Sequence, residues 1–172
     1  MKKMKAFFAA ITLLLCVSNV YAEEGDYVAS IGSTQYETLD EAIENALDGE
    51  EIVLLKDAST NGMYLNKSIT INGNNNNVVF DTYGIALWDN ANLTFKNVNV
   101  NMKGITATPY SEWNWMTICA SKNSKLVLNN TTMTLDGNGT KTHAIYFTGN
   151  NKLELNNSTL EIKNYKEDAL EW

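Results

Sequence analysis

The chain carries one ten-residue pattern three times, over residues 93–102, 126–135 and 153–162. Each copy has an apolar residue at its first, third, eighth and tenth positions and Asn at its fifth. A unit this short cannot bury its apolar face alone, whereas stacked copies bury it against one another. The repeat therefore predicts a solenoid, a fold in which each unit packs only on its neighbours.

The apolar residues of each unit alternate with polar ones, which is the period of a strand rather than a helix. The alternation extends upstream of each copy, where apolar pairs precede the leading Leu: Ile85 and Leu87, Ile118 and Ala120, and Ile145 and Phe147. A further unit begins at residue 169. Each unit is thus predicted to contain three short strands, in the first full copy at residues 85–87, 93–95 and 98–102. Stacking such units gives an all-β fold, a parallel β-helix with three-strand coils.

The Asn at the fifth position falls where the chain must turn between the second and third strands of a coil. A left-handed backbone makes such a turn, and Gly and Asn adopt it at lower cost than other residues. Stacked Asn side chains can also hydrogen-bond to one another along the solenoid. We therefore predict a structural turn ladder of Gly73, Asn97, Asn130 and Asn157. The alternative left open is that Asn is merely abundant in this chain.

The spacing of Leu93, Phe95, Asn97 and Val100, with its copies, resembles the right-handed parallel β-helices of the pectate-lyase-like superfamily and their asparagine ladder. The resemblance covers residues 50–172, and residues 28–55 are similar to the lead-in of many bacterial secreted β-helix proteins. It implies the fold, and it implies no single activity, because such folds carry many functions.

The first residues have the pattern of a secretory signal peptide. Lys2, Lys3 and Lys5 precede an apolar run over residues 6–20, and Ala22 completes a small-residue cleavage site. The run is shorter than the roughly 20 residues that span a bilayer, so a retained membrane anchor is the weaker interpretation. Residues 1–22 are therefore predicted to be removed, which places the mature protein outside a bacterial cell or on its surface, with no membrane segment.

Residues 23–50 are predicted to form an N-terminal cap. Alternating segments around residues 32–33 indicate a hairpin, and residues 38–41 form a capping box that opens an amphipathic helix with Gly49 as its stop. The helix places its apolar stripe, Leu39, Ala42, Ile43 and Ala46, on one side, which suits it to cover the open end of a solenoid. The parallel β-helix then occupies residues 51–172, and we expect it to be incomplete at its C-terminal end.

Charge and cysteine content exclude several classes of function. The net charge is −7 and every basic residue is Lys, which disfavours nucleic acid and anionic membranes as partners. After signal cleavage Cys119 is the sole cysteine, so no intramolecular disulfide is possible. We expect Cys119 to be a structural, half-exposed residue that points outward from the first strand of its coil.

The candidate binding residues are aromatic. The longest connection between coils, residues 103–115, contains three of them, and two more are expected on the same flank; together they are Trp88, Tyr110, Trp113, Trp115 and Tyr146. Aromatic rings beside a polar groove are suited to stacking on sugars, so a polysaccharide or a host or cell-surface glycan is the expected partner. The alternative left open is that the loop folds back and its rings only pack on the solenoid wall.

Catalytic chemistry has less support. The resemblance implies that lyases of the superfamily hold calcium on acidic residues of the first-strand face, beside an Arg or Lys base, and that related glycosidases use Asp clusters. The outward first-strand residues here are Ala86, Cys119, Tyr146 and Glu171, and the chain has no Arg. No cofactor is predicted, and calcium has no ligand set in the sequence. We expect a non-catalytic surface scaffold for adhesion or glycan contact; the alternative is the N-terminal part of a polysaccharide lyase or glycoside hydrolase with catalytic coils beyond residue 172.

Overall fold

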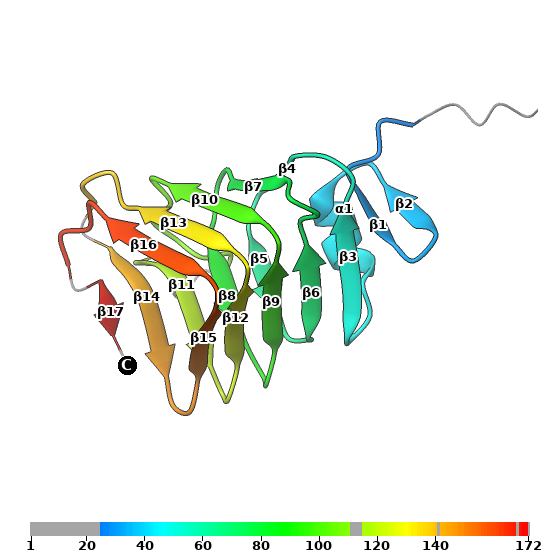
Figure 1. The fold of residues 1–172 in the computed structure, drawn as a ribbon. Coiled ribbons are helices and arrows are strands. Elements are labelled where there is room, and N and C mark those ends of the chain that lie inside the picture. The colour runs from blue at the N-terminus through cyan, green and yellow to red at the C-terminus, as the bar shows by residue number, and fades with distance from the viewer. Residues whose placement is uncertain (1–24, 111–114, 141, 168, 172) are drawn as a thin grey trace, which may run out of the picture.

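A computed structural model describes residues 25–110, 115–140, 142–167 and 169–171. The strands of these residues form three sheets, and from β3 onward consecutive strands visit the three sheets in strict rotation. The fold is therefore all-β with one short helix, and its strands stack side by side in an arrangement compatible with a β-helix-like fold (Figure 1).

Two of the sheets, B and C, are parallel throughout the described residues. Sheet B has the spatial order β16 (Thr159–Lys163), β13 (Thr132–Asp136), β10 (Asn99–Lys103), β7 (Asn77–Phe80) and β4 (Ala58–Thr60). Sheet C has the order β17 (Leu170–Glu171), β14 (His143–Thr148), β11 (Met116–Ser121), β8 (Ile85–Leu87) and β5 (Met63–Leu65).

Sheet A combines parallel coil strands with an antiparallel hairpin. Its order is β15 (Lys152–Asn156), β12 (Lys125–Asn129), β9 (Asn92–Lys96), β6 (Ile69–Asn72), β3 (Glu50–Leu54), β1 (Ala29–Ile31) and β2 (Thr34–Tyr36). The hairpin of β1 and β2 attaches to the edge of β3 with Ala29 opposite Leu54, so it continues sheet A beyond the first coil. The predicted hairpin is confirmed.

The register of the sheets follows the phase of the sequence repeat. Leu93, Leu126 and Leu153 are direct neighbours across β9, β12 and β15. Leu93 and Leu126 are completely buried, as are Phe95 and Leu128 two residues further along. Because alternate side chains of a strand point to opposite faces, the repeated apolar positions face one interior, although Leu155 of the last copy stays 42% exposed. The prediction that each unit supplies three strands to one core is confirmed.

The turn from sheet A to sheet B uses the repeated Asn. Asn97, Asn130 and Asn157 have φ of 50°, 47° and 49°, in the left-handed region where Asn is tolerated. The side-chain amide of Asn130 donates to Oδ1 of Asn97 at 3.3 Å, which links two neighbouring coils. The backbone N–H groups of Asn97 and Asn130 also donate to the next coil, to the carbonyls of Asn129 and Asn156 at 3.0 and 2.9 Å.

Gly73 has a different role from the one predicted. It is in register with Asn97, yet the left-handed residues of its turn are Asn74 and Asn75, with φ of 50° and 69°. A Cβ on Gly73 would lie 2.4 Å from the Cβ of Val98 in the next coil. Glycine is needed there for close approach between coils and not for a left-handed backbone, so that part of the prediction is wrong.

A second pair of stacked amides lies at the turn from sheet C to sheet A. Asn90 and Asn123 have φ of 67° and 62°, and the side-chain amide of Asn123 donates to Oδ1 of Asn90 at 3.3 Å. Asn also precedes the leading Leu of each sequence copy by three residues, at positions 90, 123 and 150. Two corners of the coil are thus formed by the same combination of left-handed backbone and amide stacking.

The N-terminal helix covers the first coil. Helix α1 (Leu39–Asn45) begins after Thr38, whose Oγ1 accepts a hydrogen bond from the Glu41 N–H at 3.1 Å. The predicted stripe of Leu39, Ala42, Ile43 and Ala46 is buried in one cluster with the core residues of β3. The predicted stop is wrong: the helix ends at Asn45, and Gly49, with φ of 84°, makes the turn into β3.

The predicted signal peptide, residues 1–22, lies outside the described residues. In the part of the chain that the structure describes, no helix has the length and apolar character needed to cross a membrane.

Candidate functional site

One column of side chains runs along the outer face of sheet C. Register places Tyr64, Ala86, Cys119, Tyr146 and Glu171 side by side on β5, β8, β11, β14 and β17. They alternate with core residues such as Ile118 and Ile145, so they lie on the face opposite the core. The sequence predicted four of these five residues for this face.

The connection from β10 to β11 folds back over this column. Ile105 joins the main core, and its carbonyl accepts a hydrogen bond of 2.7 Å from the Thr117 hydroxyl. The Gly84 N–H donates to the Ala107 carbonyl at 2.8 Å, and Thr108 is buried. These contacts fix residues 104–110 against sheet C, so the loop covers its centre.

Cys119 is consequently enclosed. It forms a small apolar cluster with Ala86 and Met116, against which Tyr110 and Tyr146 pack. It is completely buried, and burial raises the pKa of its thiol to about 12, with a smaller opposing effect from a hydrogen bond with Thr108. The expectation of a half-exposed cysteine is wrong, because the sequence did not show that the loop would cover this face. A thiol so protonated is a poor nucleophile.

Three aromatic rings stack at one end of the covered region, and we call them the stacked triad. The ring of Tyr110 lies between those of Tyr64 and Trp88, with centroid distances of 5.9 and 5.1 Å and interplanar angles of 12° and 29°. The ammonium of Lys122 lies 5.7 Å from the Trp88 ring centroid and also pairs with Asp89 at 2.7 Å. Tyr64 remains 46% exposed, whereas Trp88 and Tyr110 are half-buried.

A second aromatic group, which we call the edge cluster, consists of Trp115, immediately before β11, and of His143 and Tyr146 on β14. The ring of Trp115 meets Tyr146 and His143 edge-on, at centroid distances of 5.0 and 5.4 Å. Nδ1 of His143 lies 3.6 Å from Oε2 of Glu171 on the next strand. Trp115 is 40% exposed, so the cluster presents an indole surface to solvent beside an imidazole and a carboxylate.

The two interpretations of the aromatic loop, an accessible binding surface and rings packed on the solenoid wall, each apply to different residues. Tyr110 packs on the solenoid wall, as the structural alternative requires, while Trp115 keeps much of its ring accessible. Trp88 and Tyr146 lie on the expected face of sheet C, and Trp113 falls outside the described residues.

Sequence reasoning missed Tyr64 and His143. Residues 63–65 match residues 85–87 in their alternation, so extending the repeat one coil upstream would have placed Tyr64 in the outward column. His143 sits opposite Met116 at the start of its strand, where the irregular loop obscures the phase of the repeat.

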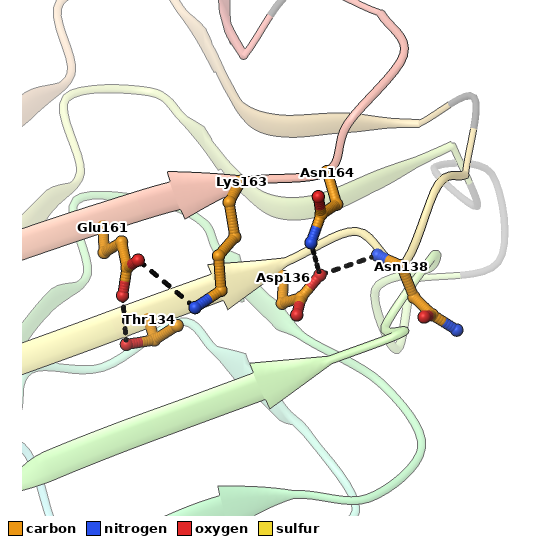
Figure 2. A network of polar contacts seen from close by, with 6 residues as sticks. All are labelled: Thr134, Asp136, Asn138, Glu161, Lys163 and Asn164. Atoms are coloured by element: carbon orange, nitrogen blue, oxygen red, sulfur yellow. Dashed lines mark hydrogen bonds and ion pairs between the residues drawn. The ribbon is translucent and has the colours of Figure 1, made fainter.

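A polar network on sheet B lies apart from these aromatic groups. Asp136 accepts hydrogen bonds from the Asn164 side chain at 2.8 Å and from the Asn138 N–H at 2.9 Å (Figure 2). Lys163 meanwhile pairs with Glu161 at 3.2 Å. The Asn164 hydrogen bond, then that of Asn138, hold the pKa of Asp136 below its ordinary value, and Lys163 and Lys103 add to the effect. This arrangement fastens a turn to the next coil and leaves its carboxylate ionised.

Metal binding has no ligand set in the described residues, where no three His, Cys, Asp or Glu side chains gather closely enough to hold an ion. The candidate site is an aromatic surface with a few polar groups beside it.

Comparisons with known proteins give no relative for this chain. No protein-family model, curated protein or solved structure matches it significantly.

Proposed function

We propose that the protein is a secreted, non-catalytic surface scaffold that contacts glycans through the aromatic side chains on the outer face of sheet C. The observation that carries the proposal is that separate coils bring aromatic rings to this one face, in the stacked triad and in the edge cluster. The proposed residues are Trp88, Tyr110, Trp115 and Tyr146, with Trp113 from the adjoining segment and Tyr64 added.

The proposal includes a finer fold assignment, a right-handed parallel β-helix similar to the pectate-lyase-like superfamily. The repeat phase, the left-handed Asn turns and the rotation of strands among three sheets support it. Residues 1–22 would direct secretion from a bacterial cell, and the apolar run and small-residue cleavage site support that assignment.

Aromatic rings favour sugars for a physical reason. The C–H face of a pyranose is apolar and matches a ring face, while its hydroxyl groups remain available to neighbouring polar side chains. Trp115 offers such a ring at 40% exposure, next to His143 and Glu171. Contacts of this kind are individually weak, so affinity would come from several coils binding one long polymer.

The test is binding of the mature protein to a panel of immobilised polysaccharides, measured beside Trp115→Ala and Trp88→Ala variants. Val79→Ala is the matched control, because Val79 is similarly exposed, at 43%, but lies on sheet B. We expect the two aromatic variants to lose most of the binding and the control to retain it. Equal binding by all four proteins, or none by any of them, would overturn the proposal.

A further inference from the structure

A pocket of about 380 Å³ lies between the N-terminal helix and the first coil, beside the stacked triad. Its described lining comes from α1, from the turn between β4 and β5, from β5 itself and from the loop that covers sheet C: Asp40, Ile43, Glu44, Asn61, Gly62, Tyr64 and Pro109. We propose that this pocket binds one neutral pyranose residue of a glycan and excludes uronic acids. The inference rests on the proposed function and assigns the cap a part in it.

Tyr64 supplies the platform of the pocket. Its ring is 46% exposed and stacks nearly parallel on Tyr110, at 12° and a centroid distance of 5.9 Å. At that distance the two rings are offset, so part of the Tyr64 face stays open to a ligand. Tyr110 is in turn held by Trp88, which means that the platform is oriented before any ligand arrives.

The polar wall of the pocket is equally preorganised. The carboxylate of Asp40 accepts hydrogen bonds from the Asn61 N–H and side-chain amide, at 3.1 and 2.9 Å, and from the Thr60 hydroxyl. Oδ1 of Asn61 accepts from the Thr82 hydroxyl at 3.3 Å. These bonds fix the turn between β4 and β5 against α1, so the pocket keeps its shape without a ligand.

Glu44 is the group that can bond a ligand. It lies one helical turn after Asp40, hence on the same side of α1, and its side chain is exposed. Lys67 donates to the backbone carbonyl of Glu44 at 3.2 Å, and no described residue donates a hydrogen bond to its carboxylate, so the carboxylate oxygens remain acceptors for sugar hydroxyl groups.

Charge determines which sugars fit. The described lining contains two carboxylates and no Lys, and a uronate brought into it would meet like charges. A neutral hexose has the same ring face for Tyr64 and only hydroxyl donors for the acidic wall. Its volume also suits a pocket at the lower end of the range for small-ligand sites, about 300–1,000 Å³.

The experiment follows amide resonances by NMR while cellobiose or digalacturonate is added to the mature protein. The N–H groups of Asn61 and Gly62 report on the pocket, and the indole N–H of Trp115 reports on the edge cluster. We expect cellobiose to shift the Asn61 and Gly62 signals with at least about tenfold greater affinity than digalacturonate. Tyr64→Ala should lower the affinity for cellobiose about three- to tenfold, and Tyr64→Phe should keep the wild-type affinity.

A charge variant tests the exclusion of acids separately. Glu44→Gln removes one negative charge from the wall, so the preference for cellobiose over digalacturonate should narrow severalfold. An unchanged preference in this variant, or equal cellobiose affinity in wild type and Tyr64→Ala, would contradict the inference.

The two NMR reporters separate this inference from the proposed function. If cellobiose shifts the Trp115 signal and leaves the Asn61 and Gly62 signals unmoved, the inference about the pocket is overturned and the proposed function stands. If only the Asn61 and Gly62 signals move, the inference about the pocket is supported and the edge cluster is not a glycan site. If no signal moves, both are overturned.

Discussion

The hydroxyl groups of Thr117 on β11 and Tyr165 in the connection from β16 to β17 lie 2.9 Å apart, although the two residues belong to segments two coils apart. The Thr117 hydroxyl donates its single proton to the Ile105 carbonyl at 2.7 Å, so the Tyr165 hydroxyl must be the donor to Thr117. Burial raises the pKa of Tyr165, which keeps its proton in place, and the Thr117 hydrogen bond opposes that rise. One side chain on β11 thus holds the β10–β11 loop and the β16–β17 connection together.

Replacing Thr117 with Val should loosen both connections. The substitution keeps the shape but leaves the Ile105 carbonyl and the Tyr165 hydroxyl without this partner, which costs about 1–3 kcal/mol. Urea unfolding measures the change, and Thr134→Val, at a half-buried position on sheet B, should stay within about 0.5 kcal/mol of wild type. Equal stability of the Thr117 variant and wild type would mean that the loop is held by other contacts.

The thiol of Cys119 should be unreactive in the folded protein. Its side chain is completely buried, so an alkylating reagent cannot reach the sulfur. Its pKa is raised to about 12, so the sulfur is also protonated at pH 8. Peptide mass mapping after brief alkylation checks this, with urea-unfolded protein as the positive control. Rapid labelling of the native protein would show that residues 104–110 open readily.

The same thiol makes stability depend on alkaline pH. The folded pKa is raised, so between the ordinary value near 9 and about 12 the unfolded chain loses this proton while the folded protein keeps it. Stability from this group is therefore full below pH 9 and falls as the pH rises. Cys119→Ala should flatten the decline in the urea midpoint between pH 8.5 and 10.5, relative to wild type.

Asp136 should make stability depend on pH in the opposite direction, with stability lost as the pH falls. Its pKa is lowered, chiefly by the Asn164 hydrogen bond, so its contribution is present at neutral pH and is lost as the pH falls through the folded pKa. Asn164→Ala should move the Asp136 pKa back toward its ordinary value in a carboxyl-detected NMR titration. Asp57, whose pKa is lowered by hydrogen bonds from Asn77 at the start of β7, is the internal control, and its pKa should not change.

The left-handed Asn turns can be tested with a single residue type. Asn130→Val places a β-branched side chain at φ of 47° and removes the hydrogen bond to Asn97, which should cost about 2–3 kcal/mol. Asn101→Val is the matched control, because Asn101 is exposed in the extended strand β10, where Val is favoured. Similar urea midpoints for the two variants would show that the turn tolerates any residue.

Much of the fold could be predicted because the signal repeats. Leu93, Leu126 and Leu153 occupy one phase in three copies, and strand register follows from that phase alone. The turn at Asn97 was predictable for the same reason. Gly73 was misassigned because close contact with Val98 and a left-handed backbone both select glycine, and sequence does not distinguish them.

The candidate site was less predictable because it depends on a segment that does not repeat. Nothing in the alternation of β11 shows that Ile105 and Tyr110 will return to cover Cys119. Gly84 shows how close that return is, because its N–H donates a hydrogen bond to the Ala107 carbonyl of the loop at 2.8 Å. Contacts between a loop and a sheet face depend on three-dimensional packing, and the periodicity of the sequence does not predict them.

The three corners of the coil differ in how much the number of residues varies from one coil to the next. Eight residues separate Ile85 from Leu93, Ile118 from Leu126 and Ile145 from Leu153, and seven separate each of those Leu residues from Val100, Met133 and Leu160. From sheet B to sheet C the separation varies, with 18 residues from Val100 to Ile118, 12 from Met133 to Ile145 and 10 from Leu160 to Leu170. In these three coils the variation in length is thus confined to the edge where sheet B connects to sheet C. Recognition can be elaborated there one loop at a time, while the two corners closed by Asn keep the coils in step.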